Sequence, residues 1–373
     1  MESVKVGIIG CGAISNQYLD NARQYPILNV VALADLDLER AKSQAAKYGI
    51  AKACSVDELI ADPSIEITLN LTIPAAHVPI SLQSLEAGKH TFCEKPLGVT
   101  REEGRTLVDT ATKKGLRVGC APDTFLGAGI QTARKLIDDG AIGRPLAFTA
   151  FTMSRGHEHW HPSPEFYYEA GGGPMFDMGP YYLTALMQLF GPIRRVSALA
   201  TIAIKERTIL SKPKFGKRIL GQTPDHVSGS IEFENGVVGT IIASFATRAA
   251  TYDGRNPIHV FGDAGALKVP DPNAFDGPVM YCKFGGADGE KDEYAEVPQT
   301  FVTGYGRAIG LADMASAIRH NRPHRCSLDQ SFGVLDAMQG FLDSSATGQA
   351  ILMTPGYTRP AAMDGTLGFG VLD

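Results

Sequence analysis

The chain has 373 residues, of which 44% are hydrophobic, and it carries 40 acidic against 35 basic side chains. This length exceeds what one ordinary hydrophobic core covers, so we expect two domains. The slightly negative net charge, without any Lys/Arg run in the sequence, argues against nucleic-acid and membrane-surface partners.

The six cysteines are scattered and form no C-x-x-C pair, which is typical of reduced core residues. The sequence shows no signal-peptide pattern at its start and no apolar stretch long enough to span a bilayer. We therefore expect a cytoplasmic protein.

Strands and helices alternate in the N-terminal part, which predicts a Rossmann-type parallel sheet. An apolar, β-branched run at residues 4–10 is followed by a G-x-G-x-x-small motif and then by a helical pattern through residue 24. Such a turn lets a dinucleotide pyrophosphate reach the first amides of the helix. The residues expected to hold the cofactor here are Gly10, Cys11, Gly12, Ala13 and Ile14.

A second apolar run, residues 28–34, ends at Asp35. In such folds an acid at this position binds the ribose hydroxyls of NAD and repels the 2′-phosphate of NADP. We therefore expect NAD, although the nearby Arg40 keeps NADP possible. The alternative is a plain strand-to-helix turn in which Asp35 caps the next helix.

Two further strand ends are expected at the same sheet edge, where ligands bind. The strand at 65–71 leads to Thr72, Ile73 and Pro74, with His77 one turn into a helix at 75–87. We place these four residues at the cofactor, with a solvated helix-surface role as the alternative for His77.

The short apolar run at residues 91–98 stops abruptly at Glu94, Lys95 and Pro96, as a buried strand does where it emerges. The proline keeps Lys95 out of a helix and so aims its side chain. We assign all three residues to the cofactor site, and Lys95 also to catalysis and substrate binding. A solvated strand-end lysine is the alternative.

Residues 100–114 are expected to form a helix capped by Thr100, and residues 116–121 a strand that ends before Asp123. Asp123 follows a strand end once more. It is either a substrate or cofactor contact or the first residue of a helix reaching 139.

The pattern changes near residue 145. Longer strand-like runs follow, and Asn235-Gly236 between two of them is a strong hairpin signal. The expected strands cover 146–153, 196–204, 226–233 and 237–246, the expected helices 181–189, 309–320 and 330–345, and the expected surface loop 205–223. We therefore predict an α/β protein with a Rossmann domain at 1–124 and an α+β domain at 125–373, which has an open antiparallel sheet and last helices that can pack back on the first domain.

Two polar constellations lie in the second part. Three glycines at 171–173 precede Asp177 and Tyr181, which share one face if this stretch is a continuous helix. Upstream, three histidines at alternate positions surround the only tryptophan. We predict no metal site there, because no further ligand pattern accompanies them. Instead we expect a polar, aromatic wall for a hydroxylated substrate, formed by His157, Trp160 and His161.

Four motifs together resemble the glucose-fructose oxidoreductase/inositol dehydrogenase (Gfo/Idh/MocA) family over nearly the whole chain. They are Gly10-x-Gly12 with Asp35, Thr72-x-Pro74, Glu94-Lys95-Pro96, and Gly171-Gly172-Gly173-x-x-x-Asp177-x-Gly179-x-Tyr181. The resemblance implies an NAD-dependent oxidoreductase that acts on a secondary hydroxyl of a sugar, polyol or glycoside. It also implies a homodimer or homotetramer formed through the open sheet.

In this family a lysine, an aspartate and a third residue surround the hydroxyl being oxidised. The resemblance therefore places Lys95, Asp177 and Tyr181 there, although many members have a histidine where this chain has Tyr181. A base must take the hydroxyl proton as hydride leaves, and an ammonium beside a phenol favours the phenolate. Lys95 and Tyr181 thus form the expected acid/base pair, with either residue as the base.

Other functions stay open from the sequence alone. Some relatives are hydrolases or lyases that retain NAD and work by transient oxidation, and a sugar-sensing regulator could use the same scaffold. A carboxylate on the substrate would be recognised by Arg155 or Arg307.

Overall fold

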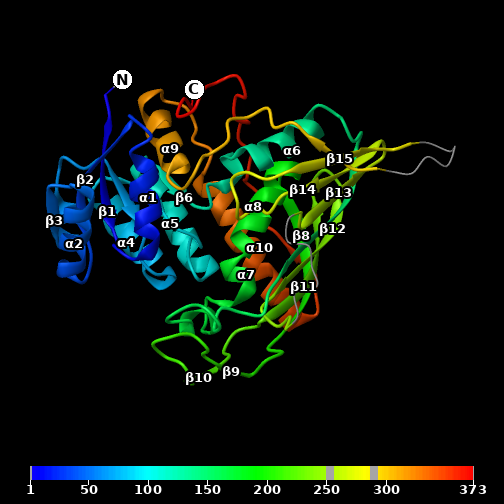
Figure 1. Cartoon of the computed structure of the whole chain (residues 1–373), viewed down its shortest axis with the longest axis horizontal. Coiled ribbons are helices and arrows are strands. Elements are labelled where there is room, and N and C mark those ends of the chain that lie inside the picture. Colours follow the sequence, from blue (N-terminus) through cyan, green and yellow to red (C-terminus); the bar gives the residue numbers. More distant parts are fainter. Residues whose placement is uncertain (1, 249–255, 286–292, 373) are drawn as a thin grey trace. The chain divides into compact units, whose positions relative to one another are not determined.

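A computed structural model describes residues 2–248, 256–285 and 293–372, and these residues form two compact units (Figure 1). Unit 1 comprises residues 1–127, 301–335 and 360–373, and unit 2 comprises residues 128–300 and 336–359. The chain thus leaves unit 1 and returns to it, because helix α9 (Ile309–Arg319) and the C-terminal segment belong to that unit.

Unit 1 is built on a six-stranded parallel sheet in the order β3-β2-β1-β4-β5-β6. The strand order reverses beside β1, which has β2 on one side and β4 on the other. In open α/β sheets ligands bind at such a reversal. The strands are β1 (Val4–Ile9), β2 (Leu28–Ala34), β3 (Lys52–Cys54), β4 (Ile67–Asn70), β5 (His90–Cys93) and β6 (Val118–Cys120).

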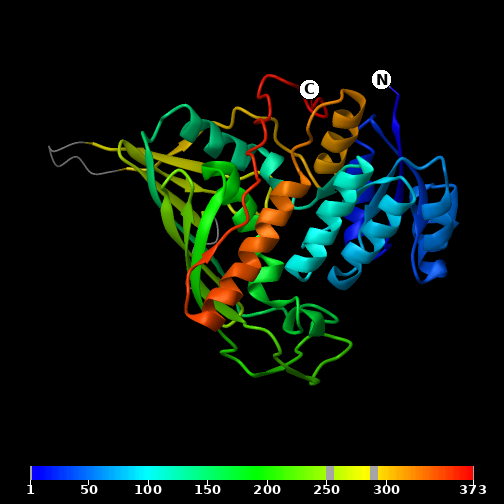
Figure 2. The same cartoon turned by 180° about the vertical axis from the view of Figure 1, so that it is seen from behind.

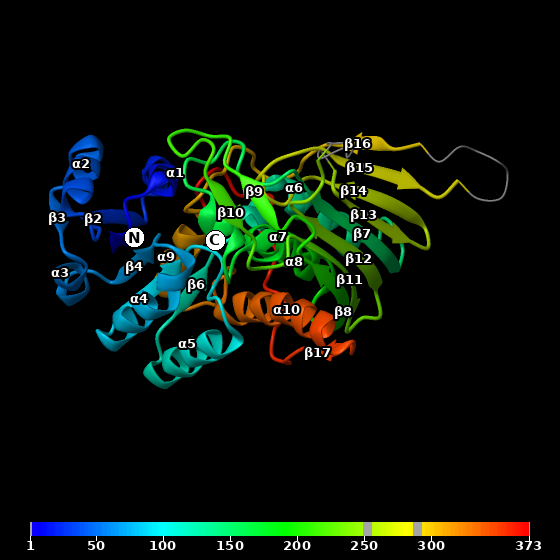
Figure 3. The same ribbon diagram turned by 90° about the horizontal axis from the view of Figure 1, so that it is seen from below.

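Helices connect these strands, and local signals fix several of their ends. In α5 the side chain of Thr100 accepts a hydrogen bond from the Glu103 amide, and Glu103 reaches back to the Thr100 amide, so the helix begins where the sequence predicts. Helices α4 and α5 pack side by side (Figure 3). The helices of this part are α1 (Ala13–Ala22), α2 (Leu38–Tyr48), α3 (Val56–Ala61), α4 (Pro74–Glu86) and α5 (Arg101–Lys114), followed by the short 3₁₀ helix η1 (Thr124–Leu126).

Unit 2 contains a nine-stranded sheet in the order β16-β15-β14-β13-β7-β12-β11-β8-β17. We predicted an antiparallel sheet, but β7 and β12 run parallel, so the sheet is mixed. The reason is that a long connection, which contains helices and the strand β8, separates β7 from the hairpin of β11 and β12, so that β12 can return in the direction of β7. The strands are β7 (Pro145–Met153), β8 (Ile193–Thr201), β11 (His226–Phe233), β12 (Val238–Ser244), β13 (Ile258–Gly262), β14 (Gly265–Val269), β15 (Val279–Lys283), β16 (Ala295–Val297) and β17 (Ile351–Leu352).

One face of this sheet is covered by helices (Figures 1 and 2). Every residue of α8 is buried, which explains why its sequence is apolar all round. The rings of Phe148, Phe190 and Phe233 join strands and helix in the core beneath it. The helices are α6 (Ala128–Asp138), α7 (Gly173–Asp177), α8 (Gly179–Phe190) and α10 (Leu328–Thr347), the last from Asp336 onward in this unit.

The segment 205–223, predicted as a surface loop, contains a small two-stranded sheet of β9 (Glu206–Thr208) and β10 (Arg218–Leu220). The prediction was wrong because alternate side chains of this segment point inward: Arg207, Ile209 and Ile219 are buried. The six cysteines are free and buried, as predicted. Within the described ranges, no helix has the length and apolar character needed to cross a membrane.

Candidate functional site

The glycine turn after β1 has the form that a dinucleotide needs. Gly10 has a φ of 101°, and a Cβ at this position would lie 2.7 Å from the carbonyl of Leu71. Gly12 caps α1 without a side-chain hydrogen bond, and a Cβ placed on it would meet nothing within 4 Å. Open space therefore lies before the first amides of a ten-residue helix, where an anionic pyrophosphate is favoured.

Asp35 braces this turn from the end of β2. Its carboxylate accepts hydrogen bonds from the Cys11 amide at 2.8 Å and from the Asp37 amide at 2.9 Å, and Arg40 lies 3.4 Å away. The cap of α2 is Asp37 instead, so the alternative of Asp35 as a helix cap is wrong. Leu36, next to Asp35, is fully exposed. No pattern in the sequence indicates that this apolar side chain lies in solvent.

His77 joins the loops that follow β4 and β5. Its ring lies between two carbonyl oxygens, 3.1 Å from that of Thr72 and 2.7 Å from that of Pro96. The side chain is 1% exposed, so a solvated helix-surface role is wrong. Burial lowers the pKa of His77, which leaves a neutral ring with one N–H at neutral pH.

Glu94 fixes the backbone that carries Lys95. It accepts hydrogen bonds from the Tyr18 hydroxyl at 2.8 Å and from the Lys95 amide at 2.9 Å, and it is 7% exposed. Burial raises the pKa of Tyr18 well above its ordinary value, so this phenol stays a hydrogen-bond donor. Glu94 on one side and His77, through Pro96, on the other therefore position the Lys95 main chain.

Asp123 lies inside unit 1. Its side chain is fully buried, accepts a hydrogen bond from the Gly310 amide at 3.1 Å and lies 3.5 Å from Arg307. Its expected contact with substrate or cofactor stays a prediction. Arg307 is 8% exposed, and its recognition of a substrate carboxylate also stays a prediction.

In unit 2, Asp177 ends α7 and Tyr181 lies in the first turn of α8. Met178 separates the two helices, so the continuous helix on which we based a shared face does not form. The side chain of Asp177 is 14% exposed, and Tyr181 is 6% exposed. Gly173, with a φ of 81°, leaves room for the carbonyl of Pro224, which lies 2.6 Å from where a Cβ would be.

The histidine segment forms a turn. The amides of Trp160 and His161 both donate to the carbonyl of His157. His157 Nε2 lies 2.8 Å from Asp177 Oδ2, and the Trp160 indole N–H donates to His157 Nδ1 at 3.2 Å. No metal-binding cluster of His, Cys, Asp or Glu is found among the residues that the structure describes.

A buried ion cluster behind this turn was missed from the sequence. Arg207, with a fully buried side chain, pairs with Glu158 at 2.8 Å and with Asp225 at 2.7 Å. Glu158 also accepts a hydrogen bond from the Tyr168 hydroxyl. The sequence predicted only a surface loop at 205–223, because nothing local distinguishes Arg207 from its exposed neighbours.

The predicted residues thus form two groups. Gly10, Asp35, Thr72 and Lys95 follow β1, β2, β4 and β5, which are adjacent parallel strands, so they share the carboxyl edge of one sheet. His157 and Asp177 contact each other in unit 2, with Trp160 and His161 in the same turn. The roles of these residues in catalysis and binding stay predictions.

Comparison with known proteins gives consistent matches to both parts of the chain. Residues 4–121 match the pattern described as "Oxidoreductase family, NAD-binding Rossmann fold", and residues 130–268 match the "GFO/IDH/MocA C-terminal domain". Two curated relatives cover much of the chain. A 1,5-anhydro-D-fructose reductase of Ensifer adhaerens is 27% identical over 92% of this chain and 97% of its own length. A trans-1,2-dihydrobenzene-1,2-diol dehydrogenase of Bos taurus is 29% identical over 72% of this chain and 75% of its own length.

Solved structures share the fold. A levoglucosan dehydrogenase in complex with NADH and levoglucosan superposes with a TM-score of 0.80 at 23% identity, covering 95% of this chain and all of that one. The predicted fold class is confirmed, with the mixed sheet of unit 2 as its one correction.

Proposed function

Because the chain belongs to the GFO/IDH/MocA oxidoreductase family, with its NAD-binding Rossmann domain, we propose that it transfers hydride between NAD and a secondary hydroxyl of a sugar, polyol or glycoside. The names of its relatives support this substrate class, since they include a sugar-derivative reductase and a cyclic 1,2-diol dehydrogenase. The observation that carries the proposal is the hydrogen-bonded pair of Asp177 and His157, a polar centre flanked by aromatic rings.

The residues of unit 1 fit a dinucleotide. Gly12 and the first amides of α1 would hold the pyrophosphate, and Asp35 the ribose hydroxyls. When bound, NAD supplies the hydride acceptor. NAD is favoured over NADP because Asp35 is a carboxylate and because Arg40, the nearest cation to it, is paired with Asp35 and Asp37.

In this proposal the protein handles the proton of the reacting hydroxyl. Lys95 and Tyr181 act on this oxygen as acid and base, since its proton must leave as the carbon is oxidised. Asp177 accepts a hydrogen bond from a substrate hydroxyl and orients the ring. An ordinary phenol titrates near pH 10, so Tyr181 depends on a stabilising cation if it is the base.

A spectrophotometric screen tests the proposed function. Wild-type protein is incubated with sugars, inositols, aldonates and glycosides, with NAD and NADP in parallel, and the reduced cofactor is followed by absorbance. Turnover of a neutral carbohydrate with NAD is the expected result. Silence with all compounds, combined with NAD that stays bound through purification, would point instead to glycoside cleavage by transient oxidation.

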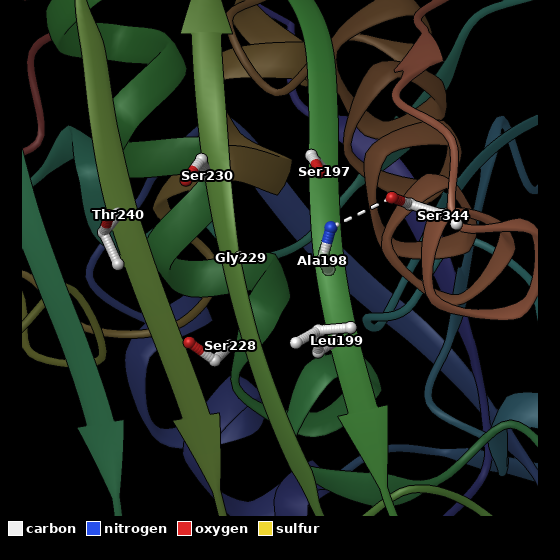
Figure 4. A pocket seen from close by; sticks show the side chains of 9 residues that line it. Ser197, Ala198, Leu199, Ser228, Gly229, Ser230, Thr240 and Ser344 are labelled. Atoms are coloured by element: carbon white, nitrogen blue, oxygen red, sulfur yellow. Dashed lines mark hydrogen bonds between the residues drawn. The ribbon is translucent and has the colours of Figure 1, made fainter.

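We also propose that the chain forms a homodimer or homotetramer through the outer face of its large sheet. Figure 4 shows hydroxyl side chains of Ser197, Ser230 and Thr240 around a depression of about 350 Å³ in this sheet. The three residues are directly paired across β8, β11 and β12. Beside them Leu199 is 76% exposed, and a subunit interface on this face would bury this apolar side chain.

A further inference from the structure

A chain of hydrogen bonds links an exposed indole to the proposed substrate-binding carboxylate in unit 2. The Trp160 indole N–H donates to His157 Nδ1, and His157 Nε2 faces Asp177 Oδ2 at 2.8 Å. The Trp160 side chain is about half exposed, at 54%, whereas His157 and Asp177 are 15% and 14% exposed. Both ring nitrogens of His157 are therefore occupied by protein groups.

The indole decides which nitrogen of His157 carries the proton. An indole N–H can only donate, so Nδ1 must offer its lone pair. The neutral ring then carries its proton on Nε2, which donates to Asp177. Protonation of His157 would place a hydrogen on Nδ1 and break the contact with Trp160. Trp160 thus selects the tautomer that gives Asp177 a hydrogen-bond donor.

The His157 ring is held in place by packing and by its main chain. It lies between the rings of Tyr167 and Phe245, with centroid distances of 4.1 Å and 4.6 Å. Its amide donates to the Tyr168 hydroxyl at 2.9 Å, and that hydroxyl donates to Glu158 in the Arg207 cluster. The donor that faces Asp177 is therefore fixed in direction.

We propose that His157 is a positioning residue that acts through Asp177: held as the Nε2–H tautomer by Trp160, it fixes the carboxylate as a hydrogen-bond acceptor for the substrate. This inference rests on the proposed function, because it assigns substrate contact to Asp177. It also replaces our expectation that His157 binds a substrate hydroxyl directly, since neither of its ring nitrogens is available.

Two substitutions distinguish the effect of the Nε2–H donor of His157 from that of its aromatic ring. His157→Phe keeps the aromatic packing against Tyr167 and Phe245 but removes the donor, whereas His157→Gln places an amide N–H where Nε2 lies. We expect kcat of the Phe variant to fall about 10- to 100-fold, the size of one lost hydrogen bond to a charged group. We expect His157→Gln to recover kcat to within about threefold of wild type, and NAD binding to stay unchanged in both.

His320→Gln is the control, because it makes the same replacement at the exposed residue directly after α9 of unit 1. We expect it to keep the wild-type kcat and KM. Equal losses in His157→Phe and His157→Gln would overturn the inference, as would a Phe variant with wild-type kcat. A change confined to KM in both variants would instead indicate direct substrate binding by His157 and would also overturn it.

The tryptophan offers a second test that needs no substrate and no Phe variant, because Trp160 is the only tryptophan in the chain. Indole emission responds to loss of the hydrogen bond that the indole N–H donates. At constant pH, we therefore expect the emission of Trp160 to change when its acceptor, His157 Nδ1, is removed.

His157→Gln should change this emission more than His161→Gln, which leaves the acceptor of the indole N–H in place and replaces a histidine whose ring also lies against the indole. The reverse pattern would overturn the inference. Emission that changes as expected, in a protein without turnover on any tested compound, would confirm the contact but remove the proposed function and with it the role of His157. If the wild-type protein turns over a substrate and both His157 variants lose kcat equally, only the inference is overturned and the proposed function stands.

Discussion

Arg207 is the residue whose replacement should most strongly destabilise unit 2. Its guanidinium lies between the carboxylates of Glu158 and Asp225, and these three side chains are 0%, 5% and 2% exposed. It also donates to the carbonyl of Phe245 at 2.8 Å. One buried cation therefore pairs with two buried anions and joins the turn that carries His157 to β9 and to the start of β11.

The substitution Arg207→Met keeps most of the side-chain length and removes the charge. It leaves Glu158 and Asp225 as two buried carboxylates without a counter-ion, and breaking a buried ion pair from one side costs about 3–5 kcal/mol. In a unit of this size each kcal/mol shifts the midpoint of thermal unfolding by about 2–4 °C. We therefore expect Tm to fall by about 6–20 °C.

Differential scanning calorimetry of the full chain measures this change. The control is Arg218→Met in the facing strand of the same small sheet, where the arginine is 73% exposed and pairs with Glu206. An exposed pair contributes at most about 1 kcal/mol, so its Tm should fall by no more than about 4 °C. Equal shifts in the two variants, or a shift below about 4 °C for Arg207→Met, would refute the role given to the buried cluster.

Three further predictions concern the cofactor, the oligomer and pH. Asp35→Ala should raise the NADP/NAD ratio of kcat/KM at least about 10-fold, because one repelling charge beside a 2′-phosphate is removed; an unchanged ratio in steady-state assays would contradict this. Leu199→Glu should raise the dissociation constant of the oligomer at least about 100-fold, since an unpaired charge would be buried in the interface; light scattering on a size-exclusion column that shows an unchanged mass would exclude this face. Burial lowers the pKa of His324 to about 4, so the unfolded chain takes up a proton before the folded one does. The contribution of His324 to the free energy of unfolding is then constant above about pH 6.5, and it decreases by about 3 kcal/mol as the pH falls from 6.5 to 4. The variant His324→Leu should lack this part of the pH dependence in urea titrations at each pH, and a variant that keeps the full dependence would contradict the assignment.

Local signals account for the parts of the fold that the sequence predicted. The capping residues of α5, the Asn235-Gly236 turn between β11 and β12, and the glycine turn after β1 each act within a few residues, so they can be recognised without the rest of the chain. Gly236 has the positive φ, 88°, that such a hairpin turn requires.

Long-range contacts account for what was missed or wrong. The parallel pairing of β7 with β12 joins residues about 90 positions apart in the chain. The burial of Arg207 depends on Glu158 and Asp225, which are 49 and 18 residues away. The hydrogen bond between Asp123 and Gly310 could not be predicted for the same reason, since Gly310 lies 187 residues further on.

The pair of His157 and Asp177 was predicted in part and missed in part. The sequence identified each residue as a candidate, because polar and aromatic side chains cluster around both. It could not show that they contact each other, since the turn at His157 and the break between α7 and α8 depend on packing in unit 2.

The central claim is that the protein oxidises a secondary hydroxyl with NAD by means of Lys95, Asp177 and Tyr181. The most direct measurement uses a substrate found in the screen, deuterated at the carbon to be oxidised, and follows deuterium into the reduced cofactor by mass spectrometry. Wild-type protein should transfer the deuterium, whereas Lys95→Met and Tyr181→Phe should bind NAD normally and transfer it at least about 100-fold more slowly. Near wild-type transfer by either variant would contradict the role of that residue, and reduced cofactor without deuterium would contradict the claim itself.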